Sequence, residues 1–561
     1  MSAHISVTAW PKRPMSTADA GAHRTQARHT LILAVCVWMA SVGNLALWQQ
    51  IRALPEVSGP RGLAFALGFA LGIAGLLVAL VAALGWGRLL RPLLSLLLVA
   101  TAVGAYFMLS YGVVIDPTMM VNVVQTDPRE VGDLLNLKLA LALLGLAGPG
   151  LWWVWRRPLQ PQPLGRQLGV HLALIVGGLA LTSGALMAIF QDFSSVMRNH
   201  TQLRYLINPL NSVWALADVA ATPFKRDTRR LEPLGQDARL APRPAGAKPP
   251  LLVLVLGETA RADNFSLNGY ARATTPELAR EDIINQRNAW SCGTNTAASV
   301  PCLFSALPRD EFERRPYNSE TLLDVLQHAG LAVLWIDNQS GCKGVCDRTP
   351  HVSTAELKDP ALCSGGECFD EIMLRGLDER IAALDPERRA RGVVLVLHQM
   401  GSHGPAYFKR SPPAFKRFLP ECTSNALQEC TREQVVNAYD NTIAYTDHVL
   451  AQTISWLKSR ESAWSPAMIY LSDHGESLGE NNLYLHGLPY GVAPDVQKHV
   501  PWITWLSNRY ARERGISTAC LKARQDERVS HDHYFHSVLG LLGVQTSAYR
   551  PELDLYRPCG G

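Results

Sequence analysis

Five long apolar segments in the first 190 residues most constrain what this chain can fold into. The hydrocarbon core of a membrane is about 30 Å thick, so a helix of roughly 20 apolar residues crosses it. A cleaved signal peptide would explain the first segment alone, but it would not explain the four that follow. The sequence therefore predicts five transmembrane helices, at residues 30–48, 63–86, 93–112, 137–155 and 168–190.

The distribution of charged residues predicts the orientation of these helices. Arginine and lysine favour the cytoplasmic side of a membrane. The N-terminal tail and the second and fourth connections are basic, whereas the third connection is net acidic. The basic residues are Lys12, Arg13, Arg24 and Arg28, then Arg88 and Arg91, then Arg156, Arg157 and Arg166; the acidic ones are Asp116, Asp127, Glu130 and Asp133. We therefore expect a cytoplasmic N-terminus and an exported C-terminal part.

The rest of the chain divides by composition. We expect a cytoplasmic tail at 1–29, the transmembrane domain at 30–190, amphipathic bridging helices and a Pro- and Ala-rich linker at 191–249, and a soluble domain at 250–561. The net charge of +5 is small and dispersed, and no nucleic-acid-binding motif accompanies it. Nucleic acid is therefore not an expected partner.

Ten of the eleven cysteines lie in the part expected to be exported, and Cys36 alone lies in the membrane half. An even number of cysteines in an oxidising compartment favours disulfides, while zinc binding by the same thiols is the alternative. Closeness in the sequence pairs Cys292 with Cys302, Cys342 with Cys346, Cys363 with Cys368, and Cys422 with Cys430, which leaves Cys520 and Cys559.

Three apolar runs in the soluble part have the pattern of strands buried on both faces, and polar groups follow each one. Glu258 follows residues 251–256; His398 and His403 follow 392–397; Asp473, His474 and Glu476 follow 468–471. Ligands of open α/β sheets collect at the carboxyl ends of strands. Carboxylate and imidazole groups bind zinc, and catalytic zinc keeps one position open, so Glu258, Asp473 and His474 are candidate metal ligands.

Two further imidazoles belong to the same region. His403 and His486 could bind phosphate oxygens, protonate a leaving group or hold a second metal ion. A lone histidine is more often a structural group. Two clusters after strands in one domain favour a functional site instead.

A candidate nucleophile lies in the segment SCGTNTAASVPCLFS at residues 291–305. Gly293 permits a tight turn, and Thr296 would lie in the first turn of the following helix, where free amides favour a phosphate. Metal coordination would activate its hydroxyl. The alternative is that Thr294 or Thr296 is only a helix N-cap.

The loop between the third and fourth spans contains Asn122, Thr126 and Glu130 at four-residue spacing, which would share one helical face. Such a face could hold a lipid head group at the membrane surface. An ordinary solvated loop is the alternative.

Taken together, these segments resemble the phosphoethanolamine transferases of Gram-negative envelopes, the lipid A modifying and mobile colistin resistance group, within the alkaline phosphatase and sulfatase superfamily. The resemblance covers nearly the whole chain. It is carried by the five spans, by GETARADNFSLNGY from Gly257, the SCGTNTAASVPC segment, GCKGVCDR from Gly341, HQMGSHGPAYFKR from His398, SDHGESLGENNLYLHGLPY from Ser472 and the closing APDVQKHVPW.

The resemblance implies a five-helix transmembrane domain and a periplasmic α/β domain of alkaline phosphatase and sulfatase type, with a central mixed sheet flanked by helices. It implies Zn²⁺ held by Glu258, Thr296, Asp473 and His474, with Thr296 as the covalently modified residue. It further implies that Lys343, His398, His403 and His486 contact phosphoethanolamine and that Asn122, Thr126 and Glu130 bind the donor head group. Relatives can carry asparagine four positions before the motif lysine, where this chain has Gln339.

The implied reaction moves phosphoethanolamine from phosphatidylethanolamine to a lipid A phosphate through modified Thr296, with His403 and His486 as further catalytic residues. The enzyme would be a monomer in the inner membrane. Core heptose or Kdo as acceptor, phosphoglycerol transfer and phosphohydrolysis are rivals on the same fold. A sulfatase would need a C/S-x-P-x-R motif, which is not evident here. A non-catalytic sensor or scaffold would leave Thr296 and the metal cluster unexplained.

Overall fold

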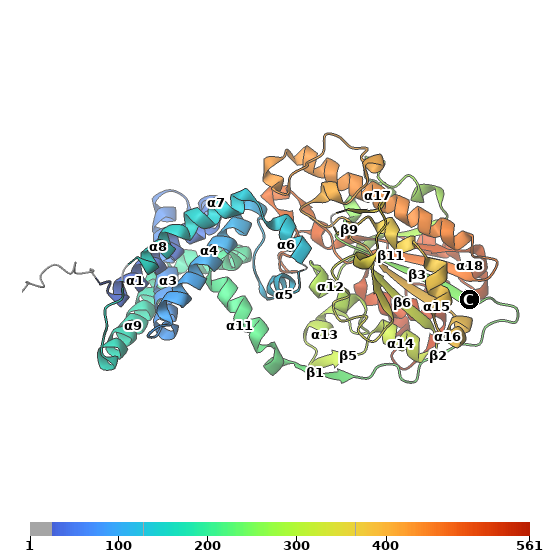
Figure 1. Ribbon diagram of the computed structural model, residues 1–561, viewed down its shortest axis with the longest axis horizontal. Coiled ribbons are helices and arrows are strands. Elements are labelled where there is room, and N and C mark those ends of the chain that lie inside the picture. The colour runs from blue at the N-terminus through green and yellow to red at the C-terminus, as the bar shows by residue number, and fades with distance from the viewer. Residues whose placement is uncertain (1–24, 127, 157, 365, 561) are drawn as a thin grey trace, which may run out of the picture.

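The computed structural model describes residues 25–126, 128–156, 158–364 and 366–560. Figure 1 shows a bundle of helices joined to a larger α/β part, with α5, α6 and α11 between the two. The tail residues Lys12, Arg13 and Arg24, and the loop residues Asp127 and Arg157, lie outside the described residues.

Four of the five predicted spans are helices long and apolar enough to cross a membrane. The first runs over Arg28–Arg52 and consists of α1 (Arg28–Ser41), a short 3₁₀ turn and α2 (Leu45–Arg52); the others are α3 (Gly59–Leu84), α4 (Leu90–Tyr111) and α9 (Leu164–Ala188). Each extends a few residues beyond the predicted bounds on at least one side.

The predicted span at 137–155 is instead a bent pair, so a total of five holds only if this pair is counted as one span. Helix α7 (Leu137–Leu146) and helix α8 (Gly148–Trp155) meet at an angle of 44°. Pro149 lies in the first turn of α8. Proline has no amide hydrogen to donate and its ring clashes with the preceding turn, which explains the break.

Small residues bring α3 and α9 into close contact. A Cβ atom on Gly75 would lie 2.5 Å from the carbonyl oxygen of Gly178, and a Cβ on Gly178 would meet the carbonyl of Gly75 at the same distance. Glycine at both positions lets the two backbones touch, which is how helices in membranes gain packing energy without a hydrophobic driving force.

The region after the bundle begins with helices, as expected, and then becomes extended. Helix α10 (Phe190–Asn199) and helix α11 (Leu210–Lys225) precede the short strands β1 (Asp227–Glu232) and β2 (Arg239–Leu240). These strands pair with β5 (Tyr317–Ser319) and β16 (Val544–Gln545) of the soluble part. The bridging helices therefore end at Lys225, and the chain attaches to the soluble part before the Pro- and Ala-rich stretch.

A mixed sheet of eight strands forms the centre of the soluble part. Strand β14 is antiparallel to both of its neighbours, and the other pairings are parallel. In spatial order the strands are β15 (Val529–Ser530), β4 (Ile283–Trp290), β14 (His499–Leu506), β11 (Ser465–Ser472), β3 (Pro250–Gly257), β10 (Val393–His398), β6 (Ala332–Asp337) and β7 (His351–Ser353). Strands β3, β10 and β11 are buried along their whole length, as their unbroken apolar runs predict.

Helices cover both faces of this sheet. One face packs against α17 (Arg432–Lys458) and α15 (Leu377–Ala383), and the other against α12 (Thr296–Leu303), α14 (Leu322–His328) and α20 (Tyr534–Leu542). The long orange helix α17 is visible along the upper side of the sheet in Figure 1. All five disulfide pairings inferred from the sequence are present.

An ion-pair network ties the loop between the third and fourth spans to the soluble part. Asp133, in α6 (Pro128–Leu134), pairs with Lys409 and lies 3.1 Å from an Nη of Arg410. Arg410 is buried, lies 2.9 Å from Glu367, and donates to the backbone oxygen of His403. Arg410 therefore connects Asp133, in the loop between two spans, to the backbone of His403, a candidate site residue.

We predict that Asp133→Ala lowers the free energy of unfolding of the full chain in detergent by roughly 3 kcal/mol, because it leaves the buried Arg410 guanidinium without one of its two carboxylates. Thermal unfolding measures the effect. Asp192→Ala is the control, since its partner Arg61 is exposed and an exposed pair contributes at most about 1 kcal/mol. Equal losses in the two variants would contradict the prediction.

Candidate metal centre and active site

Two neighbouring parallel strands deliver the central cluster. Gly257 at the end of β3 lies beside Ser472 at the end of β11. The next residues, Glu258, Asp473 and His474, are fully buried, and one potential ligand atom from each lies within 4.8 Å of the others. The carboxyl ends of parallel strands meet at one edge of a sheet, so the arrangement follows from the topology.

The hydrogen bonds of this cluster leave atoms suited to a metal ion. The Nδ1 of His474 lies 2.9 Å from the carbonyl oxygen of Gly475, which as an acceptor fixes the proton on Nδ1. Its Nε2 lies 3.3 Å from one oxygen of Glu258 and from Oδ2 of Asp473, and it can offer a lone pair to a metal ion once its proton has left. Within the described chain this Nε2 and this Oδ2 have no hydrogen-bond partner. Two carboxylates and one imidazole with such atoms fit a divalent cation.

The pKa values of the cluster residues also indicate a site for a cation. Burial and the charge of Glu258 raise the pKa of Asp473 to about 7. Burial opposes the charged form of His474, but the neighbouring carboxylates outweigh it and raise its pKa to about 9. The protein without metal therefore retains protons between its buried carboxylates, and a bound cation would take over the neutralising role of those protons.

Thr296 lies against this cluster as the first residue of α12. Its Oγ1 lies 3.1 and 3.2 Å from the two carboxylate oxygens of Glu258. The N-cap of the helix is Asn295, whose side chain accepts from the amide of Ala298, so neither Thr294 nor Thr296 has the capping role. The hydroxyl of Thr294 donates to the carbonyl of Leu488 instead. Thr296 is thus placed between a buried carboxylate and the N-terminal end of α12.

Thr259, which sequence analysis did not single out, holds both carboxylates in place. Its hydroxyl donates to Glu258 at 2.7 Å and its amide to Asp473 at 3.1 Å. It does so at a φ of +58°, a conformation that is unfavourable for a β-branched residue. Such strain is typical of functional sites, but the residue type gives no sequence signal for it.

Three histidines surround the cluster. His398 donates or accepts through Nδ1 with Asp337 at 2.8 Å, and its Nε2 lies 4.0 Å from Glu258. The rings of His403 and His486 have centroids 5.7 Å apart, and the ring of His486 lies 4.3 Å from that of His474. The structure therefore brings together the histidines that follow separate strands in the sequence.

Two further side chains lie behind these groups, and sequence analysis named both without giving either a role in the site. Glu476 accepts from the hydroxyl of Tyr407 at 2.9 Å and lies 3.3 Å from Nδ1 of His486. Gln339, the position that departs from relatives, donates to Glu258 at 3.2 Å. A longer side chain than asparagine allows this amide to reach the carboxylate. Glu476 had a weak signal, since it lies two positions after His474 behind the same strand.

The remaining predicted residues lie farther from the cluster. The Nζ of Lys343 donates to the hydroxyl of Ser340. Helix α5 (Pro117–Gln125) carries Asn122 and packs against α12, while the Thr126 hydroxyl donates to the carbonyl of Asn122. Glu130 belongs to α6, but its side chain lies outside the described residues. The structure thus brings the loop close to the nucleophile helix and leaves head-group binding by these residues a prediction.

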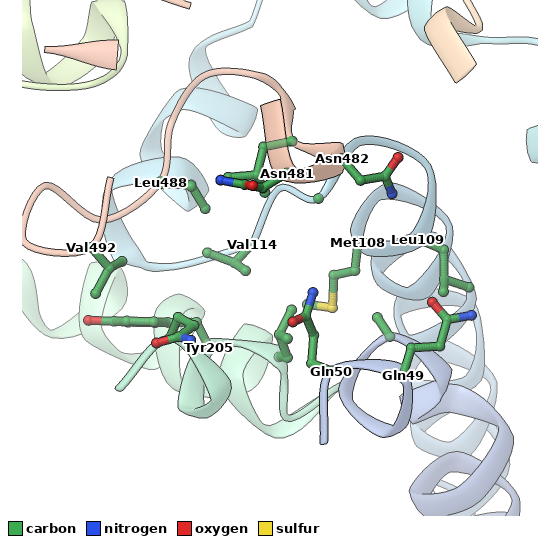
Figure 2. A pocket seen from close by; sticks show the side chains of 15 residues that line it. Gln49, Gln50, Met108, Leu109, Val114, Tyr205, Asn481, Asn482, Leu488 and Val492 are labelled. Atoms are coloured by element: carbon green, nitrogen blue, oxygen red, sulfur yellow. The ribbon is translucent and has the colours of Figure 1, made fainter. Parts of the chain in front are cut away.

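A cavity of about 490 Å³ lies where the bundle meets the loop that carries His486. Figure 2 shows Asn481, Asn482, Leu488 and Val492 of that loop facing side chains of the membrane part, including Gln49, Gln50, Met108 and Tyr205. Its walls are apolar or carry neutral amides, and no charged side chain lines it among the described residues. We call this space the neutral cavity.

Comparison with known proteins covers both halves of the chain. A family model described as phosphoethanolamine transferase EptA/EptB matches residues 73–224, and one described as sulfatase matches residues 250–544. Phosphoethanolamine transferase EptA of Salmonella typhimurium is 42% identical over 84% of this chain and 85% of its own length. Phosphatidylethanolamine transferase Mcr-1 of Escherichia coli is 37% identical over 93% of this chain and 96% of its own.

A solved structure matches nearly the whole fold. It is the integral membrane lipooligosaccharide phosphoethanolamine transferase A from Neisseria meningitidis, with a TM-score of 0.89 and 34% identity, covering 95% of this chain and 98% of that one. The membrane half and the sulfatase-type half are therefore found together in a solved relative.

We predict that Glu258→Ala and Asp473→Ala each lose most bound zinc, because each removes one carboxylate from a cluster that has only two. Metal content of the purified full chain measures this. Glu433→Ala, an exposed glutamate at the start of α17, is the matched control and should retain the wild-type content. Unchanged zinc in both site variants would remove them from the ligand set.

Proposed function

The chain belongs to the phosphoethanolamine transferase family, and we propose on that premise that it moves phosphoethanolamine from phosphatidylethanolamine to a phosphate of lipid A. The observation that carries the proposal is the position of Thr296, whose hydroxyl meets the Glu258 carboxylate at the N-terminus of α12. The solved relative is named for transfer to lipooligosaccharide, which supports a lipid A acceptor.

The proposed cofactor is Zn²⁺, held by Glu258, Asp473 and His474 with Thr296 as the fourth ligand. The buried, partly unpartnered oxygen and nitrogen atoms support this assignment. When bound, zinc would lower the pKa of the threonine hydroxyl and stabilise charge on the transferred phosphate.

In the first proposed step, Oγ of Thr296 forms a bond to the donor phosphorus while the bond between phosphorus and the glycerol oxygen breaks. The hydroxyl proton leaves towards the Glu258 carboxylate, which lies 3.1 Å away. Diacylglycerol departs after its oxygen takes a proton from His403 or His486, whose rings adjoin the cluster. The free amides of α12 stabilise the negative charge of the phosphate.

In the second step, an oxygen of the acceptor phosphate attacks the same phosphorus and the bond to Thr296 breaks. The threonine oxygen takes back the proton that Glu258 received in the first step. The hydroxyl of the acceptor phosphate gives its proton to the histidine that protonated diacylglycerol, and phosphoethanolamine leaves on the acceptor. Both substrates are membrane lipids, so a site attached to a membrane bundle supplies proximity that a free enzyme would lack.

The predicted binding residues complete the proposal. We assign Lys343, His398, His403 and His486 to the phosphoethanolamine group, and Asn122, Thr126 and Glu130 to the donor head group. The packing of α5 on α12 and the Asp337 partner that orients His398 support these roles. Glu476 positions the ring of His486 by accepting a hydrogen bond from its Nδ1.

We further propose that the protein is a monomer in a bacterial inner membrane, with residues 1–29 in the cytoplasm, spans within 30–190, a bridge at 191–249 and a periplasmic catalytic domain at 250–561. The five disulfides support an oxidising compartment for the last part.

We predict that Thr296→Ala lowers phosphoethanolamine transfer at least about a thousandfold, because it removes the nucleophile and not merely a contact. The assay uses labelled phosphatidylethanolamine and lipid A with the full chain in detergent. Thr518→Ala is the matched control, a threonine that is also the first residue of its helix but lies outside the site. Normal transfer by a folded Thr296→Ala protein would contradict the covalent mechanism.

The acceptor has a separate test. We predict that cells expressing the protein carry phosphoethanolamine on lipid A phosphate, and that mass spectrometry of lipid A and core locates it there. Addition to core heptose or Kdo alone would contradict lipid A as the acceptor. Release of free phosphoethanolamine as the sole product would identify a hydrolase, and transfer of phosphoglycerol would identify the other rival.

A further inference from the structure

A second cavity, also of about 490 Å³, lies where α5, α12 and β5 meet, and we call it the cationic cavity. Its walls include Gln125 from α5 and Ala297 and Pro301 from α12. The cavity is therefore bordered by the residue that directly follows the proposed nucleophile. Figure 1 shows α5 and α11 between the bundle and α12, which places this region at the junction of the two halves.

Four basic side chains line the cationic cavity, and most of them lack an acidic partner. Arg348 forms a two-pronged pair with Asp324 at 2.7 Å. Among the residues that the structure describes, no carboxylate forms an ion pair with Arg226, Arg315 or Lys343. Partly buried basic side chains without an acidic partner are unusual, because a charge removed from water is normally paired with an opposite charge.

Both unpaired arginines have donors available, and Arg315 is also held in place by a neighbouring ring. The guanidinium of Arg315 lies 3.6 Å from the ring centroid of Phe312 and donates one hydrogen bond to its carbonyl oxygen. The Nε of Arg226 is buried and has no hydrogen-bond partner in the described part of the chain. A guanidinium has five N–H donors, so most of them remain for a ligand.

The acidic side chains on the walls do not cancel this charge. They are Glu320 and Asp347, against four basic residues. Glu320 already accepts from the amide of Leu234 at 2.8 Å and lies 2.9 Å from Nε2 of His328. The cavity therefore has an excess of positive charge.

The titration behaviour of the arginines agrees with that excess. Burial, together with the charge of Arg226, lowers the pKa of Arg315 to about 9, and burial lowers the pKa of Arg226 as well. Both side chains stay protonated at neutral pH, so two like charges remain close together. A bound anion would relieve this repulsion.

The charged side chains on its walls distinguish the cationic cavity from the neutral cavity. The neutral cavity has no charged side chain on its walls within the described residues, so it cannot select a phosphate. Arginine forks match the geometry of phosphate oxygens and bind them with paired hydrogen bonds. Arg226 directly follows α11, the last bridging helix.

We propose that Arg226 and Arg315 bind the phosphate of the acceptor lipid and hold it beside Thr296 for the second transfer step. This inference rests on the proposed function. One oxygen of that phosphate forms the new bond to phosphorus as the bond to Thr296 breaks, and the threonine oxygen takes back the proton that Glu258 received in the first step. The donor phosphate instead binds at the cluster of Glu258, Asp473 and His474 during the first step.

The two half-reactions test the proposal separately in the full chain. Phosphatidylethanolamine alone loads Thr296, which intact-protein mass spectrometry detects as a phosphoethanolamine adduct, and lipid A added afterwards discharges the adduct. In the double variant Arg226→Gln, Arg315→Gln, loading should stay within about twofold of wild type, while discharge by lipid A should slow at least about tenfold, as expected for losing charged hydrogen bonds.

Arg314→Gln is the matched control, because this arginine neighbours Arg315 in the chain but is exposed and absent from the cavity wall. It should load and discharge like wild type. Normal discharge by the double variant would overturn the proposal. Loading that slows as much as discharge would also overturn it, because the arginines would then bind the donor lipid. If wild-type Thr296 never acquires the adduct, the result contradicts the proposed covalent transfer. It then also contradicts the inference about the acceptor, which depends on that transfer.

Discussion

The contact between two buried carboxylates constrains the rest of this structure. Glu258 and Asp473 lie side by side because they follow neighbouring parallel strands, and neither has water to screen its charge. Such a pair is stable only if protons or a cation neutralise it. The imidazole of His474, the amide of Thr259 and the hydroxyl of Thr296 all face these oxygens. These groups together fit a divalent cation, which would neutralise the two carboxylates when bound.

Much of this arrangement could be predicted from the sequence, because strands buried on both faces have a distinctive apolar pattern. Glu258, Asp473 and His474 each follow such a run, and parallel strands bring their carboxyl ends to one edge. Four disulfide pairs followed from short separations, and Cys520 and Cys559 were the two cysteines that remained. The bent span did not, because hydropathy over 137–155 is continuous and the break depends on Pro149 alone.

The supporting residues were harder to predict because their roles depend on contacts between distant segments. Asp337 is 61 positions from His398 along the chain, and Gln339 is 81 positions from Glu258. No local pattern encodes either contact. Thr259 was missed for another reason: its left-handed backbone is a property of the turn, which the residue type disfavours. Spacing therefore identifies candidate ligands, while only the fold identifies what orients them.

The membrane half does more than anchor the site, because its third connection is part of the site's surroundings. Met119 of α5 lies against Gly487, next to His486, where a φ of +90° favours glycine. On the other side, Asp133 of α6 holds Arg410, which in turn bonds the backbone of His403. One membrane loop thus contacts the segments of both outer histidines. Displacement of this loop by a lipid entering between the two halves would therefore be transmitted to both imidazoles together.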